Sequence, residues 1–231
     1  MSPPVTLVGL RNRSTTHTRE RLRLSSVAAY LAAPLWALQA VIWLGGPKVQ
    51  EAVPPYTITK PLHFALFWFS IAGAVAFSAA AAGEIPRATQ RLGSRPSWWA
   101  RLLARIALCS ATAATIATVA ALIPAVQGVA LTLMTGLLNG ALVVLALHLG
   151  LCAFLSWRGR TASRLTRMPV TAAAAATVAM IVATLASGSD SVVGLYVAVA
   201  VALLNGAAWF IWGKAAANGR LRVHTLSKAR S

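Results

Sequence analysis

Six apolar runs, each of about 20 residues or more, constrain this chain more than any other feature of its sequence. They cover about 25–45, 62–83, 99–123, 129–157, 168–187 and 191–213. An α-helix rises about 1.5 Å per residue, so about 20 residues cross the roughly 30 Å hydrocarbon core of a bilayer. The runs are apolar on every face, which argues against a soluble helical bundle. We therefore predict an all-α integral membrane protein with six transmembrane helices.

The supply of charged residues agrees with this class. Only 11% of the 231 residues are Asp, Glu, Lys or Arg, against about 25% in soluble domains. Lipid must therefore solvate much of the surface. The first run is longer than the roughly 7–15-residue core of a signal peptide, so we expect it to be retained as a span. Cys109 and Cys152 both lie inside apolar runs and are expected to be free thiols.

The basic residues predict the orientation of the spans. Of the 21 Lys and Arg residues, 18 lie in four connecting or terminal segments, and Arg105 can reach the same side from one turn inside the third span. These segments are 1–24, 84–101, 158–167 and 214–231. The opposite side holds only Lys48 and Lys60. Because basic loops stay in the cytoplasm, we predict that both termini are cytoplasmic.

The same charge pattern bears on location and partners. A net charge of +17 on one face of a membrane protein needs no nucleic-acid partner, because no soluble domain is predicted to carry a recognition surface. The bilayer is the expected partner, and no protein partner is indicated. Only 4 of the 21 basic residues are Lys, and an Arg- and Ala-rich composition is typical of GC-rich bacterial genomes. The predicted location is the bacterial inner membrane, as a multi-pass protein.

The chain divides into three parts. Residues 1–24 are predicted to be a disordered basic cytoplasmic arm, 25–213 the transmembrane domain, and 214–231 a basic cytoplasmic tail. The short connections at 124–128 and 188–190 predict that helices three and four, and helices five and six, form tight hairpins. The 46–61 segment contains four prolines. It is either a structured cap over the outer mouth or a stiff surface loop.

Small residues four apart predict where helices approach closely in lipid. Gly136 and Gly140 have this spacing in the fourth helix, and a ridge of four small residues has it in the sixth: Gly194, Ala198, Ala202 and Gly206. The pentapeptide LLNGA occurs in both helices, at 137–141 and 203–207. It indicates either a duplicated helical hairpin or a coincidence in a chain rich in Leu, Gly and Ala.

Asn139 and Asn205 are predicted to lie near the middle of the bilayer. An unpaired amide there costs several kcal/mol, so each is expected to bond across a helix interface, to the other or to Gln39 or His148. The alternative is a polar spot that faces a substrate. His148 by itself is expected to be a hydrogen-bonded core histidine, because no second ligand lies at i+3 or i+4. No cofactor or metal motif is present, so neither is predicted.

Acidic residues are absent from every predicted span, which argues against an ion-coupled pump. Two of the four acids, Glu51 and Asp190, are expected at the outer face. Aromatic and titratable residues accompany them: Trp43, Tyr56, His63, Phe64, Phe67, Trp68 and Tyr196. They form either an aromatic interfacial belt or a mouth that holds an apolar substrate against an acid. A shielded carboxylic acid can donate a proton, and aromatic faces stabilise the cation that then forms.

In length, helical membrane body and two separated acids, the chain resembles the small integral-membrane terpene cyclases. The Asn-x-x-Trp-Glu-type segment of the fungal members has no counterpart in this chain. The nearest sequence, Asn205 to Trp209, lacks the acidic residue. The resemblance implies cyclisation of an isoprenoid-type substrate and assigns no residue roles. The two acids at the predicted outer face, Glu51 and Asp190, are the candidate catalytic acids. The aromatic residues above, with Asn139 and Asn205, would then contact substrate. Two alternatives stay open: a non-catalytic transporter or self-protection protein for a small lipophile, and a structural subunit of a membrane complex.

Overall fold

The computed structural model describes the backbone of residues 7–45, 58, 61–89, 95–158, 164–187 and 192–217. Within these ranges, the side chains of 7–22, 43, 45, 87–89, 164–166, 183–187 and 192–195 are not described. The described chain is helical apart from short turns. Its elements are α1 (Leu7–Gly45), α2 (Pro61–Ala82), α3 (Glu84–Thr89), α4 (Arg95–Ala120), the 3₁₀ turn η2 (Pro124–Val126), α5 (Gln127–Arg158), α6 (Arg164–Ser187) and α7 (Val192–Ala217).

Five of these helices are long and apolar enough to cross a membrane. Their spans are Arg23–Ile42, Pro61–Pro86, Arg95–Ala120, Pro124–Arg158 and Tyr196–Ala217. They match the first four and the last of the predicted spans. The remaining predicted span forms α6, whose apolar described part, Arg167–Val182, is shorter. The all-helical class is therefore confirmed for the described chain, and the sixth crossing stays a prediction.

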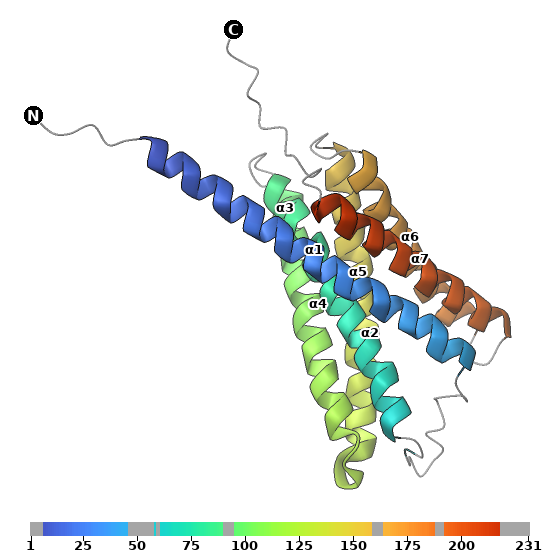
Figure 1. Ribbon diagram of the computed structural model, residues 1–231. Helices are drawn as coiled ribbons and strands as arrows, with labels where there is room; N and C mark the ends of the chain where they lie inside the picture. The colour runs from blue at the N-terminus through green and yellow to red at the C-terminus, as the bar shows by residue number, and fades with distance from the viewer. Residues whose placement is uncertain are drawn as a thin grey trace, which may run out of the picture.

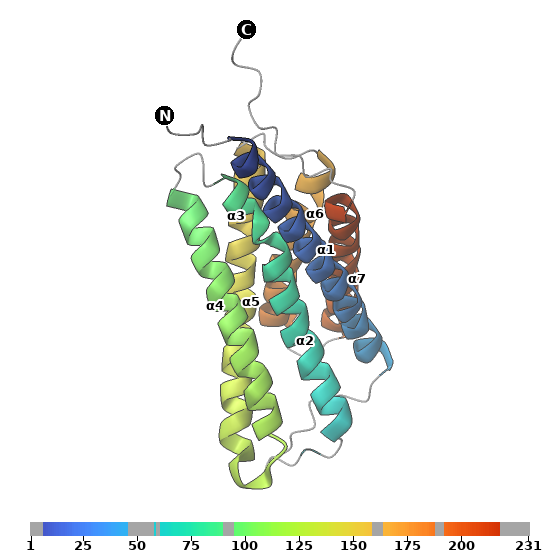
Figure 2. The ribbon, with the colours of Figure 1, turned by 60° about the vertical axis from the view of Figure 1, so that its left-hand side comes forward.

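The long helices form a closed ring. α1 packs against α2 and α7, α7 against α6, α6 against α5, and α5 against α2; α4 lies outside this ring against α2 and α5 (Figures 1 and 2). The predicted hairpin of helices three and four is confirmed, because α4 and α5 pack along each other and join through a short turn and η2. α6 and α7 also pack together, while their connection at 188–191 lies outside the described residues.

Two segments differ from the prediction. The basic arm was expected to be disordered, but α1 is helical from Leu7 onward, continuous with the first span. The 84–101 connection was expected to be a loop, but it contains α3 and the beginning of α4. Proline explains where several elements begin, because its fixed φ suits the first helical positions and its missing N–H is not needed there. Pro61, Pro96 and Pro124 all occupy such positions.

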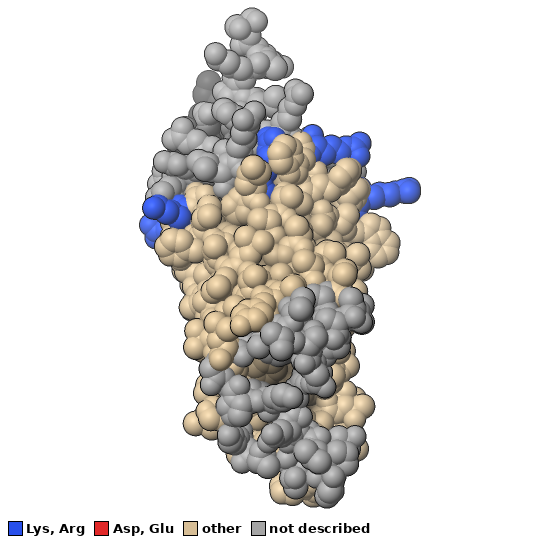
Figure 3. All heavy atoms as spheres, turned by 90° about the vertical axis from the view of Figure 1, so that its right-hand side faces the viewer, with Lys and Arg blue, Asp and Glu red and all other residues tan. Residues whose placement is uncertain are grey.

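One end of the ring is basic. The described Lys and Arg side chains are Arg23, Arg95, Arg101, Arg105, Arg158, Arg167 and Lys214. They lie where the apolar part of α1 begins, where α4 and α6 begin, and where α5 and α7 end. We call this region the basic end. On the face seen in Figure 3, the blue side chains gather toward this end, and the rest of the described surface is uncharged.

At the opposite end, a small apolar cluster joins α2, α4 and α5. It contains Phe64, Ala117, Ala121, Ala130 and Met134. Ile58 packs against it and is the one residue described within the predicted 46–61 cap, apart from Pro61 at the start of α2. The rest of the predicted cap, 46–57 and 59–60, lies outside the described residues.

Candidate functional site

Helices α1 and α7 pack closely against each other. A Cβ atom added to Gly206 would lie 3.0 Å from the carbonyl oxygen of Ala33 and 3.8 Å from Cβ of Trp36. Ala40 packs with Val199 and Ala202 nearer the opposite end. The predicted small ridge is therefore confirmed at Ala202 and Gly206, and it packs against α1.

Polar side chains of α1 tie that helix to α2. The indole Nε1 of Trp36 donates to Oγ of Ser78 at 3.0 Å, and Nε2 of Gln39 donates to the carbonyl oxygen of Phe67 at 3.0 Å. The same amide nitrogen also donates to the hydroxyl of Ser70, which donates to the Phe67 carbonyl at 2.7 Å. All these donors are buried, so the hydrogen bonds fix the rotation of α1 against α2.

Several polar atoms inside the ring have no such partner. The side chain of Asn205 is 0% exposed, and neither its Nδ2 nor its Oδ1 has a hydrogen-bond partner among the described residues. The same is true of Nε1 of Trp209 and of Oε1 of Gln39. Residues four apart lie on one face of a helix, so Asn205 and Trp209 are neighbours on the inner face of α7. Together they offer two donor groups, the amide N–H₂ of Asn205 and the indole N–H of Trp209, and one acceptor, Oδ1 of Asn205.

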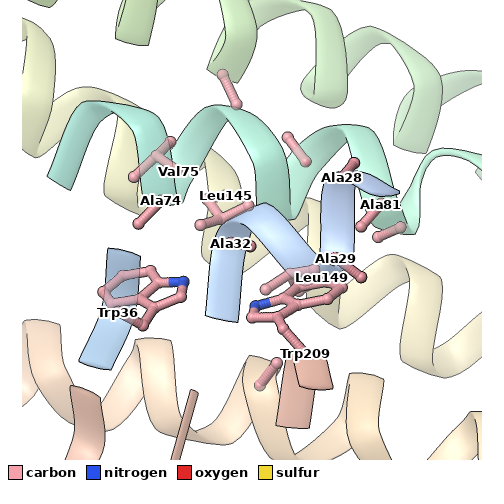
Figure 4. Packing of buried hydrophobic residues seen from close by; sticks show 14 of the residues in the cluster. Ala28, Ala29, Ala32, Trp36, Ala74, Val75, Ala81, Leu145, Leu149 and Trp209 are labelled. Carbon is pink, nitrogen blue, oxygen red and sulfur yellow. The ribbon is translucent and has the colours of Figure 1, made fainter. Parts of the chain in front are cut away.

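The surroundings of these atoms are apolar. Trp36 and Trp209 belong to one buried cluster with alanines of α1 and α2 and leucines of α5. Figure 4 shows the two indoles entering from different helices, and in this view their nitrogen atoms lie on the edges that face each other. A buried polar spot inside an apolar interior suits the polar group of an otherwise lipophilic molecule.

The predicted partners of Asn205 are wrong. Asn139 is exposed on the outer surface of α5, so it cannot pair with the buried Asn205. Gln39 bonds to α2, as described above. His148 is buried, and its Nδ1 lies 2.8 Å from the carbonyl oxygen of Ala100, which confirms a hydrogen-bonded core histidine. The close packing predicted at Gly136 and Gly140 is also wrong, because added Cβ atoms would have no neighbour within 4 Å.

The predicted aromatic mouth is only partly assembled. Phe64 and Phe67 are buried, and Trp68 is half-buried, with ring centroids 6.2 Å and 5.0 Å from theirs in edge-to-face contact. Phe64 and Phe67 belong to the protein core, and Trp68 packs against it. His63 is exposed and Tyr196 is 64% exposed, so both lie on the outer surface.

The predicted catalytic acids Glu51 and Asp190 lie outside the described residues, as do Tyr56 and the side chain of Trp43. The structure therefore does not test an acid at the mouth. Four polar residues of this region were not predicted from the sequence: Trp36, Ser70, Ser78 and Trp209. Their spacing could have indicated two of them, because residues three or four apart share a helix face. Trp209 follows Asn205 by four residues, and Trp36 precedes Gln39 by three.

Within the described part of the chain, no group of three or more His, Cys, Asp or Glu side chains could hold a metal ion. No protein-family model, curated protein or solved structure matches this chain. Its function must therefore be argued from its own residues.

Proposed function

We propose that this chain is a membrane protein that binds a lipophilic small molecule inside the ring of helices, with Asn205 and Trp209 holding its polar group. The five long apolar helices are compatible with a membrane protein. The observation that carries the rest is the amide of Asn205, which is fully buried with neither atom paired among the described residues.

The free-energy cost of that amide supports a bound molecule. A buried donor or acceptor without a partner costs about 1–3 kcal/mol, and the hydrocarbon of a bilayer supplies no water to replace it. A ligand hydroxyl would accept from the Asn205 N–H₂ group or from the Trp209 indole, and would donate to Oδ1 of Asn205. A carbonyl would accept from both residues. The alanines and indoles around this spot require the rest of the ligand to be apolar.

Six crossings with both termini in the cytoplasm form part of this proposal. The clustering of the described Lys and Arg side chains at the basic end supports that orientation. Reporter fusions at Ser231 and in the 84–101 and 158–167 segments are expected to report cytoplasm, and fusions in 46–61 the outside. A fusion at Ser231 that reports the outside would disprove six crossings in this orientation.

Asn205→Leu tests the proposed binding. Lipophilic molecules that copurify with the full chain in mild detergent would be extracted and compared by mass spectrometry between the wild type and the variant. We expect a small molecule in wild-type extracts that is reduced at least tenfold in Asn205→Leu. The variant should melt no lower than ligand-free wild type, because a similar volume is kept and an unpaired amide is removed.

Asn139→Leu is the matched control. It makes the same chemical change within the same pentapeptide, but on the exposed face of α5, so it should keep the copurifying molecule at the wild-type level. Equal recovery from all three proteins, or recovery from none of them, would contradict a ligand held by Asn205.

The binding function is preferred to cyclisation because the described residues Asn205 and Trp209 support it, whereas the candidate acids Glu51 and Asp190 lie outside the described residues. Glu84 of α3 is the one acidic side chain that the structure describes, and it lies near the basic end. Cyclisation would need Glu51 or Asp190, and so it stays a prediction of the sequence. Replacing them as Glu51→Gln and Asp190→Asn separates the functions, because a binding protein should keep its ligand in both variants.

A further inference from the structure

The basic end carries a second arrangement, between α5 and α6, that the binding function does not use. The guanidinium carbon of Arg167 lies over the indole of Trp157, 5.6 Å from the ring centroid. The indole Nε1 of Trp157 donates to Oγ1 of Thr171 at 3.1 Å, and that hydroxyl donates to the carbonyl oxygen of Arg167 at 2.9 Å. The three residues form a closed set of contacts that holds the arginine against the tryptophan.

The arginine in this set is incompletely paired. Its side chain is half-buried, and its Nε is buried without a hydrogen-bond partner among the described residues. A cation–π contact with an indole is not a hydrogen bond, so it leaves the N–H groups of a guanidinium available, and these bind phosphate oxygens in pairs. On the same end of α5, the guanidinium of Arg158 lies over the ring of Phe154 at 5.8 Å.

The position of the set indicates what would bind there. Trp157 and Arg158 are the last two residues of the span Pro124–Arg158, and Trp157 is 50% exposed. Tryptophan at the end of a span lies at the level of lipid headgroups. Basic sites between helices at that level bind anionic lipid headgroups.

We infer that Arg167, held on Trp157 between α5 and α6, binds the phosphate of an anionic phospholipid. Arg158, the next residue after Trp157, adds a second positive charge at the same end of α5. The lipid's acyl chains would lie along the exposed apolar faces of α5 and α6, which include Phe154 and Met168. This site is separate from Asn205, and either proposal can fail without the other.

The test is lipid binding to the purified full chain in nonionic detergent, with bound lipids counted by native mass spectrometry. Phosphatidylglycerol is expected to bind the wild type in a defined stoichiometry and phosphatidylcholine at least tenfold more weakly. Arg167→Gln should weaken phosphatidylglycerol binding about tenfold. Arg167→Lys keeps the charge but loses the paired donors, so its affinity for phosphatidylglycerol should lie between those of the wild type and Arg167→Gln.

Arg95→Gln is the control, since it removes one exposed positive charge from the same end of the molecule. It should change phosphatidylglycerol binding less than twofold. Equal losses in the Arg95 and Arg167 variants would overturn the site in favour of diffuse charge attraction. Equal binding of the two lipids, or full competition by inorganic phosphate, would overturn it as a lipid site. An Arg167→Gln variant that does not fold leaves the Arg167→Lys comparison to decide.

Discussion

The pentapeptide LLNGA occupies two helices of this bundle and meets opposite surroundings in each. At 203–207 on α7, the asparagine and glycine point inward, with Asn205 fully buried and Gly206 against the backbone of α1. At 137–141 on α5, Asn139 is exposed and Gly140 has open space where a side chain would begin. The inward residues of this α5 copy are instead Leu138 and Ala141.

The difference shows that the neighbouring helices, and not the local amino-acid sequence, decide which face of a helix is buried. Each residue turns an α-helix by about 100°, so the two inward pairs lie on opposite sides of the pentapeptide, about half a turn apart. α7 packs against α1 and α6, whereas α5 packs against α2, α4 and α6. A duplicated hairpin predicts equivalent surroundings for the two copies. The packing therefore favours coincidence as the origin of the repeat.

The glycines of the two copies should differ most in their tolerance of a larger residue. We expect Gly206→Leu to lower the melting temperature strongly or to prevent folding, because its nearest obstacle, the Ala33 carbonyl 3.0 Å away, is backbone and cannot rotate aside. Gly206→Ala should have a smaller effect in the same direction. Thermal melts in detergent measure both.

Gly140→Leu is the matched control for this prediction. Nothing lies within 4 Å of its added Cβ, and leucine has a higher helix propensity than glycine, so the melting temperature should be unchanged or slightly higher. Equal destabilisation by the two leucine variants would mean that the two copies are packed alike after all.

The helices themselves could be predicted from the sequence, because hydropathy is a local property. Five of the six predicted spans coincide with long apolar helices, and their boundaries differ by at most five residues. The inward faces could not be predicted in the same way. In a soluble helix the buried stripe is apolar and the rest is polar, whereas in lipid both faces are apolar and the periodic signal is lost.

The candidate site shows the same limit. Asn205 was selected because asparagine is costly in hydrocarbon, a reason that applies equally to the exposed Asn139. Trp36 and Trp209 were missed because tryptophan in a membrane protein is expected at the headgroup level. Both are 1% exposed and lie well inside their spans. Their importance depends on contacts between α1, α2 and α7 that are far apart in sequence.

The leucines of the two copies give the smallest expected difference. Leu138 on α5 is 2% exposed, whereas its counterpart Leu204 on α7 is 49% exposed. Replacing a buried leucine with alanine costs a transfer term and a cavity term in water-soluble proteins. In a bilayer the separated helices remain in an apolar solvent, so the cavity and the lost packing contacts account for most of the cost.

We therefore expect Leu138→Ala to destabilise the bundle by about 1–2 kcal/mol, below the usual range of about 2–5 kcal/mol for soluble cores. Leu204→Ala should change stability by less than about 0.5 kcal/mol, the range typical of surface positions. Reversible unfolding in mixed detergent measures both variants. A larger loss of stability for Leu204→Ala than for Leu138→Ala would contradict this arrangement. It would mean that the face of α7 that carries Leu204, and not the face that carries Asn205, is buried in the bundle.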